Sequence, residues 1–390
     1  MMLRLAPVLT AALLTACQTA TLASTDAPAA AFTNADAIDT YQGLGLVEGA
    51  PAPLPETATS TIANPEAVFA DALAYARETE SYALLIWHDG ALVLEHYFPG
   101  YDADVRAEPA SMHKSVLGLV TAKAIEEGLI ESPDTPIGTY IREWANDPRG
   151  EITVEQLLTM SSGLEPLSYV GGDNAPARQF MAGKLDARAT ILDLQFEAAD
   201  AQHFHYINTV SQLLLLVVEN ATGTGYADYL SEKIWQPIGA SDAQVYNFED
   251  GGFPRGYASF LARPVDWLRL GLLVKDDGRF GGQQVIDADL VRELKSPSQY
   301  NPDYGWQIWR GETWDEQRFY NDEDAGFAVT HSAPFAVDDL VYFDGFGGQR
   351  VYTSQSEDLV IVRLGNTSTV WDDAQLPNRV IGALRSLGKD

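Results

Sequence analysis

The segment around Ser111 and Lys114 constrains the fold of this chain most strongly, because a Ser-x-x-Lys spacing here opens a long apolar stretch. The residues after Lys114 predict a helix that reaches about Glu127 and ends at Gly128. This helix is apolar on nearly every side, which is typical of a helix in the core of a globular domain. We therefore expect a central helix whose first turn carries a serine and a lysine.

The same spacing has chemical consequences. Residues three positions apart share a helix face, so the hydroxyl of Ser111 is expected beside the amine of Lys114. A helix N-terminus also offers free N–H groups and the positive end of a dipole, which can stabilise an oxyanion. Ser386 and Lys389 repeat the motif near the C-terminus, where a frayed chain end cannot hold a site rigid. We therefore predict Ser111 as a nucleophile activated by Lys114.

The charge of the chain excludes some partners. The 390 residues carry 25 basic and 55 acidic side chains, a formal net charge of −30, which argues against nucleic acid or anionic lipid headgroups as ligands. Apolar residues make up 46% of the chain, enough for the core of one large domain or two small ones. We interpret the acidic excess as a solvated surface.

The first residues predict an export signal. Residues 1–16 combine a short charged start with an apolar run too short to span a membrane. The run ends in Leu-Thr-Ala-Cys, which resembles a bacterial lipobox with Cys17 as the lipidated residue. Because Cys17 is the only cysteine, the chain has no intramolecular disulfide, Cys-ligated zinc or catalytic cysteine. Residues 17–65 are rich in Ala, Thr, Ser and Pro and predict a flexible tether. We expect a lipid anchor in a bacterial envelope, in the outer membrane facing the periplasm.

Residues 66–390 predict one folded domain of the α+β class. Two strand-like runs flank Asp89-Gly90, a hairpin signal, and helical patterns fill the middle of the chain. Further strand-like runs and a closing helix follow, at 304–309, 340–343, 349–353, 359–364 and 374–387. We therefore expect one antiparallel sheet, built from both chain ends and flanked by helices, with a mostly helical insert at about 111–245. Ser111 would lie where the sheet meets the insert, a favoured place for clefts.

Two further segments carry candidate site residues. Tyr206 and Asn208 directly precede an apolar helix at 210–222, and a tyrosine close to a lysine can share a proton with it. The glycine-rich segment 343–349 lies in the strand region, where glycine marks the close approach of another group to the backbone. That segment has two interpretations, a strand edge that donates an N–H to an oxyanion and a β-bulge or loop.

The order of these motifs resembles a known family. Ser111-x-x-Lys114, Tyr206-x-Asn208 and the Gly-x-Gly-Gly-Gln of 345–349 are similar to the serine β-lactamase and penicillin-binding protein superfamily. The detail resembles its class C-like esterase branch, and above all proteins like 6-aminohexanoate-dimer hydrolase. Residues 153–164 and 234–239 match two more segments of that branch. The resemblance runs from about Ser81 to Arg385 and implies a β-lactamase-like fold.

The resemblance also implies roles for individual residues. Ser111 would attack an ester or small amide, forming an acyl-enzyme, and Lys114 would accept its proton. Tyr206 would pass the proton to the leaving group, and no cofactor would be needed. The remaining positions implied to contact the substrate or its oxyanion are Asn208, Gly345, Phe346 and Tyr169.

One position departs from the family pattern. Where the superfamily has Lys-Thr-Gly, this chain has Phe343-Asp344-Gly345. That lysine meets the carboxylate of a penicillin in the family, whereas Asp344 would repel it. We therefore favour an esterase or small-amide hydrolase. The alternatives are a β-lactamase or D-Ala-D-Ala peptidase and a non-catalytic ligand-binding lipoprotein on the same scaffold.

The histidines do not predict a metal site. His203 and His205 have the spacing of two ligands on a strand, but no cysteine or carboxylate cluster lies near them in the sequence. His113 lies inside the first motif, where we interpret it as a packing residue. His331 precedes the last strands and is expected at the surface or in a loop.

Overall fold

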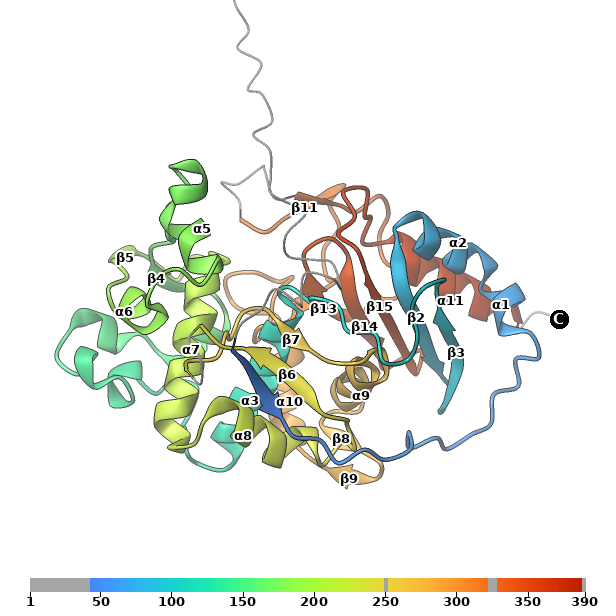
Figure 1. Cartoon of the computed structure of the whole chain (residues 1–390), viewed down its shortest axis with the longest axis horizontal. Coiled ribbons are helices and arrows are strands. Elements are labelled where there is room, and N and C mark those ends of the chain that lie inside the picture. Colours follow the sequence, from blue (N-terminus) through green and yellow to red (C-terminus); the bar gives the residue numbers. More distant parts are fainter. Residues whose placement is uncertain (1–42, 249–251, 322–327, 388–390) are drawn as a thin grey trace, which may run out of the picture.

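A six-stranded antiparallel sheet is the largest sheet in the computed structural model of the chain, which describes residues 43–248, 252–321 and 328–387 (Figure 1). The predicted signal peptide and Cys17 lie outside these residues. The strand order is β10-β13-β14-β15-β2-β3. The six strands are β2 (Ser81–His88), β3 (Ala91–Tyr97), β10 (Trp309–Arg310), β13 (Val341–Gly345), β14 (Gln349–Ser354) and β15 (Leu359–Gly365).

Both ends of the folded chain contribute to this sheet, as the sequence predicts. β2 and β3 form a hairpin, and β15 pairs with β2 in a register that places Ile361 opposite Ile86. The hairpin turn has positive φ at both Asp89 (48°) and Gly90 (76°), the geometry that an Asp-Gly pair favours. Every residue of β14 and β15 is buried, so both faces of the sheet centre are covered.

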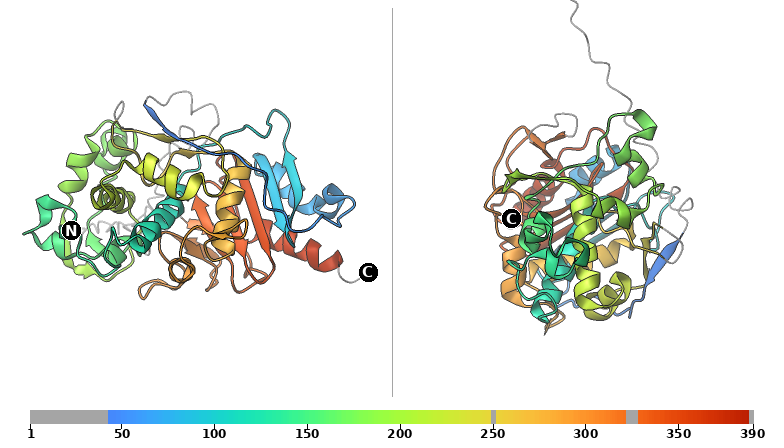
Figure 2. Two further views of the ribbon diagram at one scale, coloured as in Figure 1. Left: turned by 90° about the horizontal axis from the view of Figure 1, so that it is seen from below. Right: turned by 90° about the vertical axis from the view of Figure 1, so that its left-hand side faces the viewer.

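Helices cover both faces of the sheet (Figures 1 and 2). On one face, α2 packs against β2 and against the C-terminal helix α11, whose buried residues form a single stripe. On the other face, α9 packs on β14, β15 and β2, while α3 packs on β13. The helices that flank the sheet are α1 (Pro65–Val68), α2 (Ala70–Glu78), α3 (Met112–Glu126), α9 (Pro264–Lys275), α10 (Ala288–Lys295) and α11 (Gln375–Leu387).

The part of the predicted helical insert that follows α3 packs against this helix, on the side away from β2 and β3 (Figure 1). Its longest helix, α7 (Asn208–Thr222), is terminated by Gly223, a left-handed residue with φ of 65°. Ten of its residues are buried, so α3 and α7 form the core of this half. The other helices of the insert are α4 (Val154–Leu158), α5 (Pro176–Met181), α6 (Ala187–Leu192) and α8 (Tyr226–Leu230), followed by a π-helical turn at Ser231–Trp235.

Four small sheets complete the described part of the chain. β1 (Leu44–Val47) pairs with β6 (Ala243–Tyr246), which pairs with β7 (Phe260–Leu261). The prediction of a flexible tether up to residue 65 is therefore wrong for β1, because its backbone is hydrogen-bonded to the folded domain. The remaining pairs are β4–β5 (Ser162–Leu164 with Phe196–Ala201), β8–β9 (Arg279–Phe280 with Gln283–Gln284) and β11–β12 (Gln317–Phe319 with Ala328–Thr330).

The prediction of a strand at 304–309 is wrong for most of that segment. Only Trp309 and Arg310 pair with β13. Gln307 has a positive φ of 58°, which interrupts an extended chain, and its backbone N–H donates to the carbonyl of Leu158. The segment therefore bends to support α3 and α4 instead of extending the sheet. Among the described residues, no helix is long and apolar enough to cross a membrane.

Gly118 marks the closest approach of α3 to its neighbours, and this makes a stability prediction. A Cβ at Gly118 would lie 2.6 Å from the carbonyl oxygen of Trp306, which is backbone and cannot rotate away. Alanine usually stabilises a helix relative to glycine by about 1 kcal/mol. We expect Gly118→Ala to reverse that sign and cost about 1–3 kcal/mol through overpacking, measured by denaturant unfolding.

Gly382 provides the matched control, because it lies in α11 and nothing stands within 4 Å of the position that a Cβ would take there. Gly382→Ala should leave the free energy of unfolding unchanged or raise it by up to about 1 kcal/mol. Equal effects of the two substitutions would mean that α3 is not packed as closely as described.

Candidate active site

Ser111 lies at the N-terminus of α3 on a strained turn. It occupies the N-cap position of the helix and is partly exposed. The preceding residue, Ala110, has φ of 49°, in the left-handed region that a non-glycine residue rarely adopts. The buried carboxylate of Glu108 accepts hydrogen bonds from the N–H groups of Ala110 (3.0 Å) and Ser259 (2.8 Å). The turn that presents Ser111 is therefore held in place by a buried carboxylate.

Lys114 lies directly beneath this serine and is almost fully buried, with 1% of its surface exposed. Its Nζ lies 2.9 Å from Ser111 Oγ. The same nitrogen donates to Asn208 Oδ1 at 2.8 Å and to the backbone carbonyl of Tyr257 at 3.2 Å. The predicted neighbours Ser111, Lys114 and Asn208 are thus brought together, and Tyr257 joins them.

Burial changes the protonation of Lys114. Loss of hydration lowers the pKa of its amine from 10.5 to about 7, and the negative charge of Asp344 opposes only part of that effect. Asn208 Oδ1 and the Tyr257 carbonyl oxygen can only accept hydrogen bonds. In the neutral amine, these two oxygens accept hydrogen bonds from both N–H groups. The nitrogen lone pair can then accept a hydrogen bond from the hydroxyl of Ser111. This geometry suits a general base.

Tyr206 packs against Lys114 from the start of the α7 segment. The Lys114 Nζ lies 4.8 Å from the centroid of the Tyr206 ring. The backbone of Tyr206 is fixed by the Asn321 side chain, which accepts from its N–H at 2.5 Å and donates to its carbonyl at 3.3 Å. Burial, and then the charge of Asp344, raise the pKa of the phenol well above its usual value. Tyr206 is therefore a neutral hydroxyl that can donate or relay a proton.

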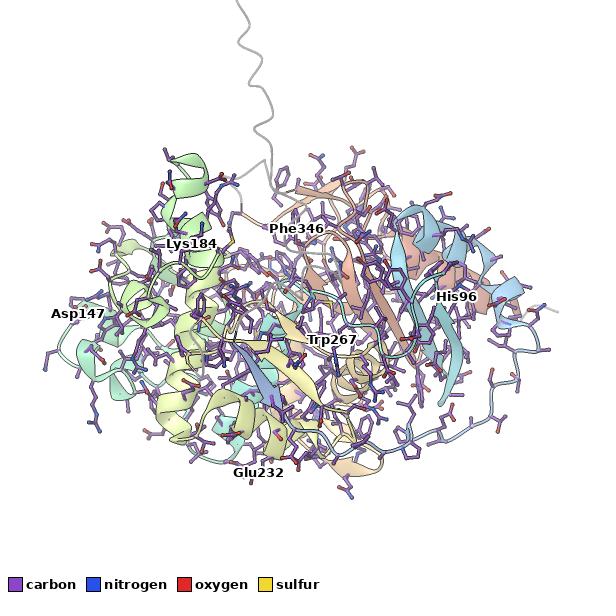
Figure 3. The ribbon with its side chains drawn as sticks, in the orientation of Figure 1. His96, Asp147, Lys184, Glu232, Trp267 and Phe346 are labelled. Atoms are coloured by element: carbon purple, nitrogen blue, oxygen red, sulfur yellow. The ribbon has the colours of Figure 1, made fainter. Side chains whose placement is uncertain are left out.

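The end of β13 closes the site from the sheet side. A Cβ at Gly345 would lie 2.1 Å from the carbonyl oxygen of Pro109, so only glycine lets the strand approach the turn before Ser111 this closely. Phe346 follows Gly345 and has 40% of its surface exposed (Figure 3). Within the described residues, no protein acceptor takes the backbone N–H of Ser111 or of Phe346. Both N–H groups are available to a ligand.

Asp344 does not present a bare negative charge, in contrast to our sequence interpretation. Its carboxylate is fully buried and contacts Arg318 Nη2 (2.5 Å) and Arg350 Nη1 (2.7 Å), and it accepts from the hydroxyl of Tyr320 (3.0 Å). Two guanidinium groups therefore compensate its charge. Repulsion of a substrate carboxylate by Asp344 is much weaker than the sequence alone predicts.

Several other candidates have clear positions. Tyr169 is 47% exposed, and its contact with the substrate stays a prediction. His113 is buried between the carbonyl of Ala258 and the hydroxyl of Tyr226, which confirms it as a packing residue. His331 lies in the loop after β12, one of the two positions expected for it, but it is buried there, with 4% exposed. Among the described residues, no group of three or more His, Cys, Asp or Glu side chains is arranged to hold a metal ion.

The sequence gives no signal for two contributors to the site. Tyr257 acts through its backbone carbonyl, which any residue could supply, and no motif surrounds it. Asn321 acts on the backbone of Tyr206 from more than 100 residues away. A polar residue next to aromatic residues is too common in sequences to mark Asn321.

Comparison with solved structures identifies the class of fold. A protein from Bacillus anthracis assigned as a 6-aminohexanoate-dimer hydrolase superposes with a TM-score of 0.68, covering 90% of this chain and 91% of that one at 19% identity. EstCE1, described as a hydrolase with promiscuous acyltransferase activity, gives a TM-score of 0.59 at 15% identity, covering 82% of this chain and 97% of that one. The predicted β-lactamase-like α+β fold is confirmed.

The family follows from the sequence. Residues 66–384 match the family described as Beta-lactamase, so the chain belongs to this family, as the motifs predict. The 6-aminohexanoate-dimer hydrolase of Paenarthrobacter ureafaciens is 28% identical over 228 residues, which cover 56% of this chain and 57% of that protein. The similarity to this relative therefore spans little more than half of its length.

The buried amine makes a prediction that does not depend on any reaction. Between pH 7 and 10.5 the unfolded chain binds the proton that folded Lys114 lacks, so the free energy of unfolding rises with pH over this window. Lys114→Met removes this contribution. We expect the free energy of unfolding of the wild type, relative to that of Lys114→Met, to rise by about 1.4 kcal/mol for each pH unit. Urea unfolding at several pH values in this range measures this difference. A difference that stays constant with pH would show that Lys114 remains charged in the folded protein.

Proposed function

We propose that the protein is a serine hydrolase that cleaves an ester or small amide through an acyl-enzyme on Ser111. The observation that carries this proposal is the arrangement around Lys114. Two acceptors, Asn208 Oδ1 and the Tyr257 carbonyl, occupy its N–H groups, and its third position faces Ser111 Oγ at 2.9 Å. A buried amine held in this way is a base with one available partner, the serine hydroxyl.

The reaction would proceed in two halves. Ser111 Oγ attacks the substrate carbonyl while its proton moves to Lys114, and the C–O bond forms as the carbonyl oxygen becomes an oxyanion. Tyr206 then gives its proton to the departing alcohol or amine and regains one from the Lys114 ammonium. In the second half a water molecule attacks the acyl-enzyme, the proton movements reverse, and the carboxylic acid leaves.

The oxyanion would be held by two backbone N–H groups. One belongs to Ser111, where the end of α3 adds its positive dipole, and the other belongs to Phe346. The close contact of Gly345 with Pro109 supports this assignment, because it brings the end of β13 against the turn that carries Ser111. No cofactor takes part in these steps.

The relatives support hydrolysis of a small amide or ester. One relative is named a 6-aminohexanoate-dimer hydrolase, which is an amide-cleaving activity, and a solved structure with the same fold is described as a hydrolase with acyltransferase activity. An acyl-enzyme of the kind proposed for Ser111 accounts for both activities, because either water or another nucleophile can accept the acyl group. The position of the superfamily's lysine is occupied here by the buried Phe343, which offers no charge to a substrate carboxylate.

Replacing the nucleophile tests this proposal. We expect the wild type to hydrolyse p-nitrophenyl butyrate and Ser111→Ala to lose at least about 1,000-fold in kcat, with its thermal unfolding unchanged. Ser386→Ala is the control, because Ser386 belongs to the second Ser-x-x-Lys and lies on the exposed end of α11. It should retain full activity.

Other outcomes of the same assay would change the assignment. Nitrocefin measured in parallel should react far more slowly than the ester, and fast nitrocefin turnover would identify a β-lactamase. Ester hydrolysis that survives in Ser111→Ala would remove Ser111 from the mechanism. A wild type inactive on both substrates and unlabelled by a fluorophosphonate would favour the non-catalytic binding protein.

The pH dependence tests the role of Lys114. Only the neutral amine can accept the serine proton, so kcat/KM should rise about tenfold per pH unit below pH 7 and level off above it, because the pKa of Lys114 is about 7. No loss is expected up to about pH 9, since burial raises the pKa of Tyr206 far above that value. A flat profile across neutral pH, with Ser111 still required, would exclude Lys114 as the base.

A further inference from the structure

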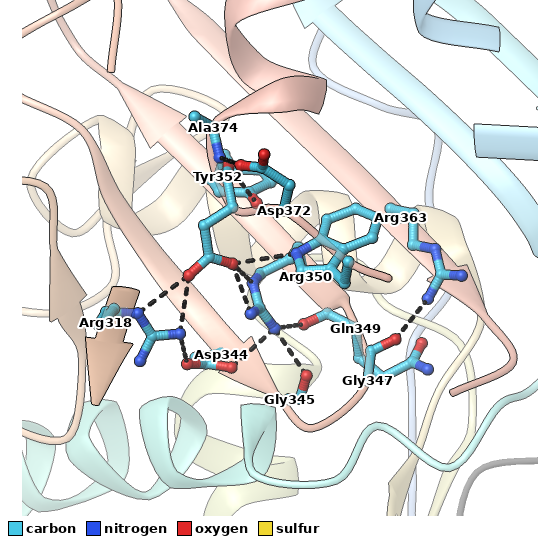
Figure 4. Close-up of polar contacts among 12 residues, drawn as sticks. Arg318, Asp344, Gly345, Gly347, Gln349, Arg350, Tyr352, Arg363, Asp372 and Ala374 are labelled. Carbon is cyan, nitrogen blue, oxygen red and sulfur yellow. Dashed lines mark hydrogen bonds and ion pairs between the residues drawn. The ribbon is translucent and has the colours of Figure 1, made fainter. Parts of the chain in front are cut away.

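Two arginines and two aspartates form a closed ring of charges beside the end of β13 (Figure 4). Arg318 and Arg350 each contact both Asp344 and Asp373, so positive and negative groups alternate around the ring. Each of these four side chains is buried, with between 0% and 9% of its surface exposed. Because each buried charge has two opposite neighbours, the ring is neutral as a whole, and removing one member would leave a charge uncompensated.

Arg318 differs from the other three members in where it comes from. Arg350 and Asp344 lie on paired strands of the central sheet, and Arg350 also donates to the carbonyl of Gly345 at 2.6 Å. Asp373 precedes α11 and accepts from the indole N–H of Trp371 at 3.0 Å. Arg318 comes from β11, in the separate two-stranded sheet β11–β12. It therefore ties this outlying hairpin to the main sheet.

One layer of aromatic rings separates Arg318 from the candidate active site. Its guanidinium carbon lies 4.4 Å from the ring centroid of Trp309 and 4.8 Å from that of Tyr320. The centroid of the Tyr206 ring lies 5.5 Å from that of Trp309 and 5.3 Å from that of Tyr320. Tyr320 also donates its hydroxyl to Asp344. The position of Tyr206 therefore depends on two rings that pack against Arg318.

The charge of Asp344 reaches the proposed acid–base pair. The titratable groups around Lys114 are His113 on α3, Tyr206 before α7, Tyr257 before β7 and Asp344 on β13. Of these, Asp344 favours the charged form of Lys114, and it raises the pKa of both Lys114 and Tyr206. A less compensated Asp344 would hold a proton on Lys114 and so remove the base.

Among the described residues, no other cationic side chain lies beside Arg318 and could compensate Asp344 in its place. Besides the two aspartates, the titratable groups around Arg318 are Tyr320, Tyr342 and the buried His331. Burial, and also the charge of Arg318, lower the pKa of His331, so this imidazole stays neutral at pH 7. Within the described residues, compensation of Asp344 therefore comes from Arg318 and Arg350.

We propose that Arg318 is a positioning residue for the reaction on Ser111: it fixes the aromatic layer against Tyr206 and compensates the charge of Asp344 near Lys114. This inference rests on the proposed function. It assigns to β11 a role in the proton transfer, although Arg318 itself lies one ring away from the reacting groups.

Arg318→Gln tests this inference, because it removes the charge while it keeps a polar side chain. We expect the rising limb of the kcat/KM profile to move to higher pH by about one unit, with about a fivefold loss at pH 7 that is recovered at about pH 9. The loss should fall on kcat, with KM changed less than twofold. Arg318→Lys keeps one positive charge and should shift the limb by less than Arg318→Gln.

Arg269→Gln is the matched control. Arg269 is also buried, with 5% exposed, and contacts Asp266 and the carbonyl of Ile238 from α9. Its loss should lower the thermal midpoint while the pH profile stays that of the wild type. If Arg318→Gln behaves in the same way, losing stability with an unshifted profile, Arg318 is only a structural residue and the inference is wrong.

Labelling by a fluorophosphonate separates this failure from failure of the proposed function. Label on the wild type that is absent from Ser111→Ala establishes the nucleophile without reference to Arg318. If the nucleophile is established and both Arg318 variants keep the wild-type profile, only the role of Arg318 is refuted. If Arg318→Gln does not fold, Arg318→Lys decides, because an unshifted profile in that variant with lowered stability would also refute the role.

Discussion

The burial of Lys114 is the interaction on which the rest of the site depends. An amine with 1% of its surface exposed is stable only where its hydrogen bonds are satisfied, and here the acceptors come from α7 and from the segment before β7. α7 belongs to the predicted helical insert, and the segment before β7 follows that insert in the chain, whereas Lys114 lies on a helix that packs on the sheet. The two halves of the molecule therefore meet around one nitrogen, and their packing determines its protonation.

The charge ring follows from the same constraint. A carboxylate near a buried amine favours the protonated amine, so an uncompensated Asp344 would oppose the effect of burial on Lys114. Arg318 and Arg350 hold the carboxylate in a neutral group instead. The site thus combines a buried aspartate with an amine that is neutral near pH 7.

The sequence predicts the parts of the site that lie close together in the chain. Ser111 and Lys114 follow from helical spacing, and the resemblance to a family adds Tyr206, which the structure places against Lys114. Arg318 could not be predicted, because its partners lie 26 and 55 residues further along the chain and no local pattern links them. β1 was missed for a similar reason, since β6, with which it pairs, lies about 200 residues further along the chain. Pairings that are set by tertiary structure leave no periodicity in the sequence.

Several features of the site lower the stability of the fold, and this bears on function. A positive φ at Ala110, a buried amine at Lys114 and a strand that only glycine lets approach are each unfavourable for a chain that needs only to fold. They converge on a single partly exposed hydroxyl, that of Ser111. A scaffold that only bound a ligand would gain stability by losing any one of them. Their coincidence at one atom is therefore the strongest structural argument that Ser111 carries out chemistry.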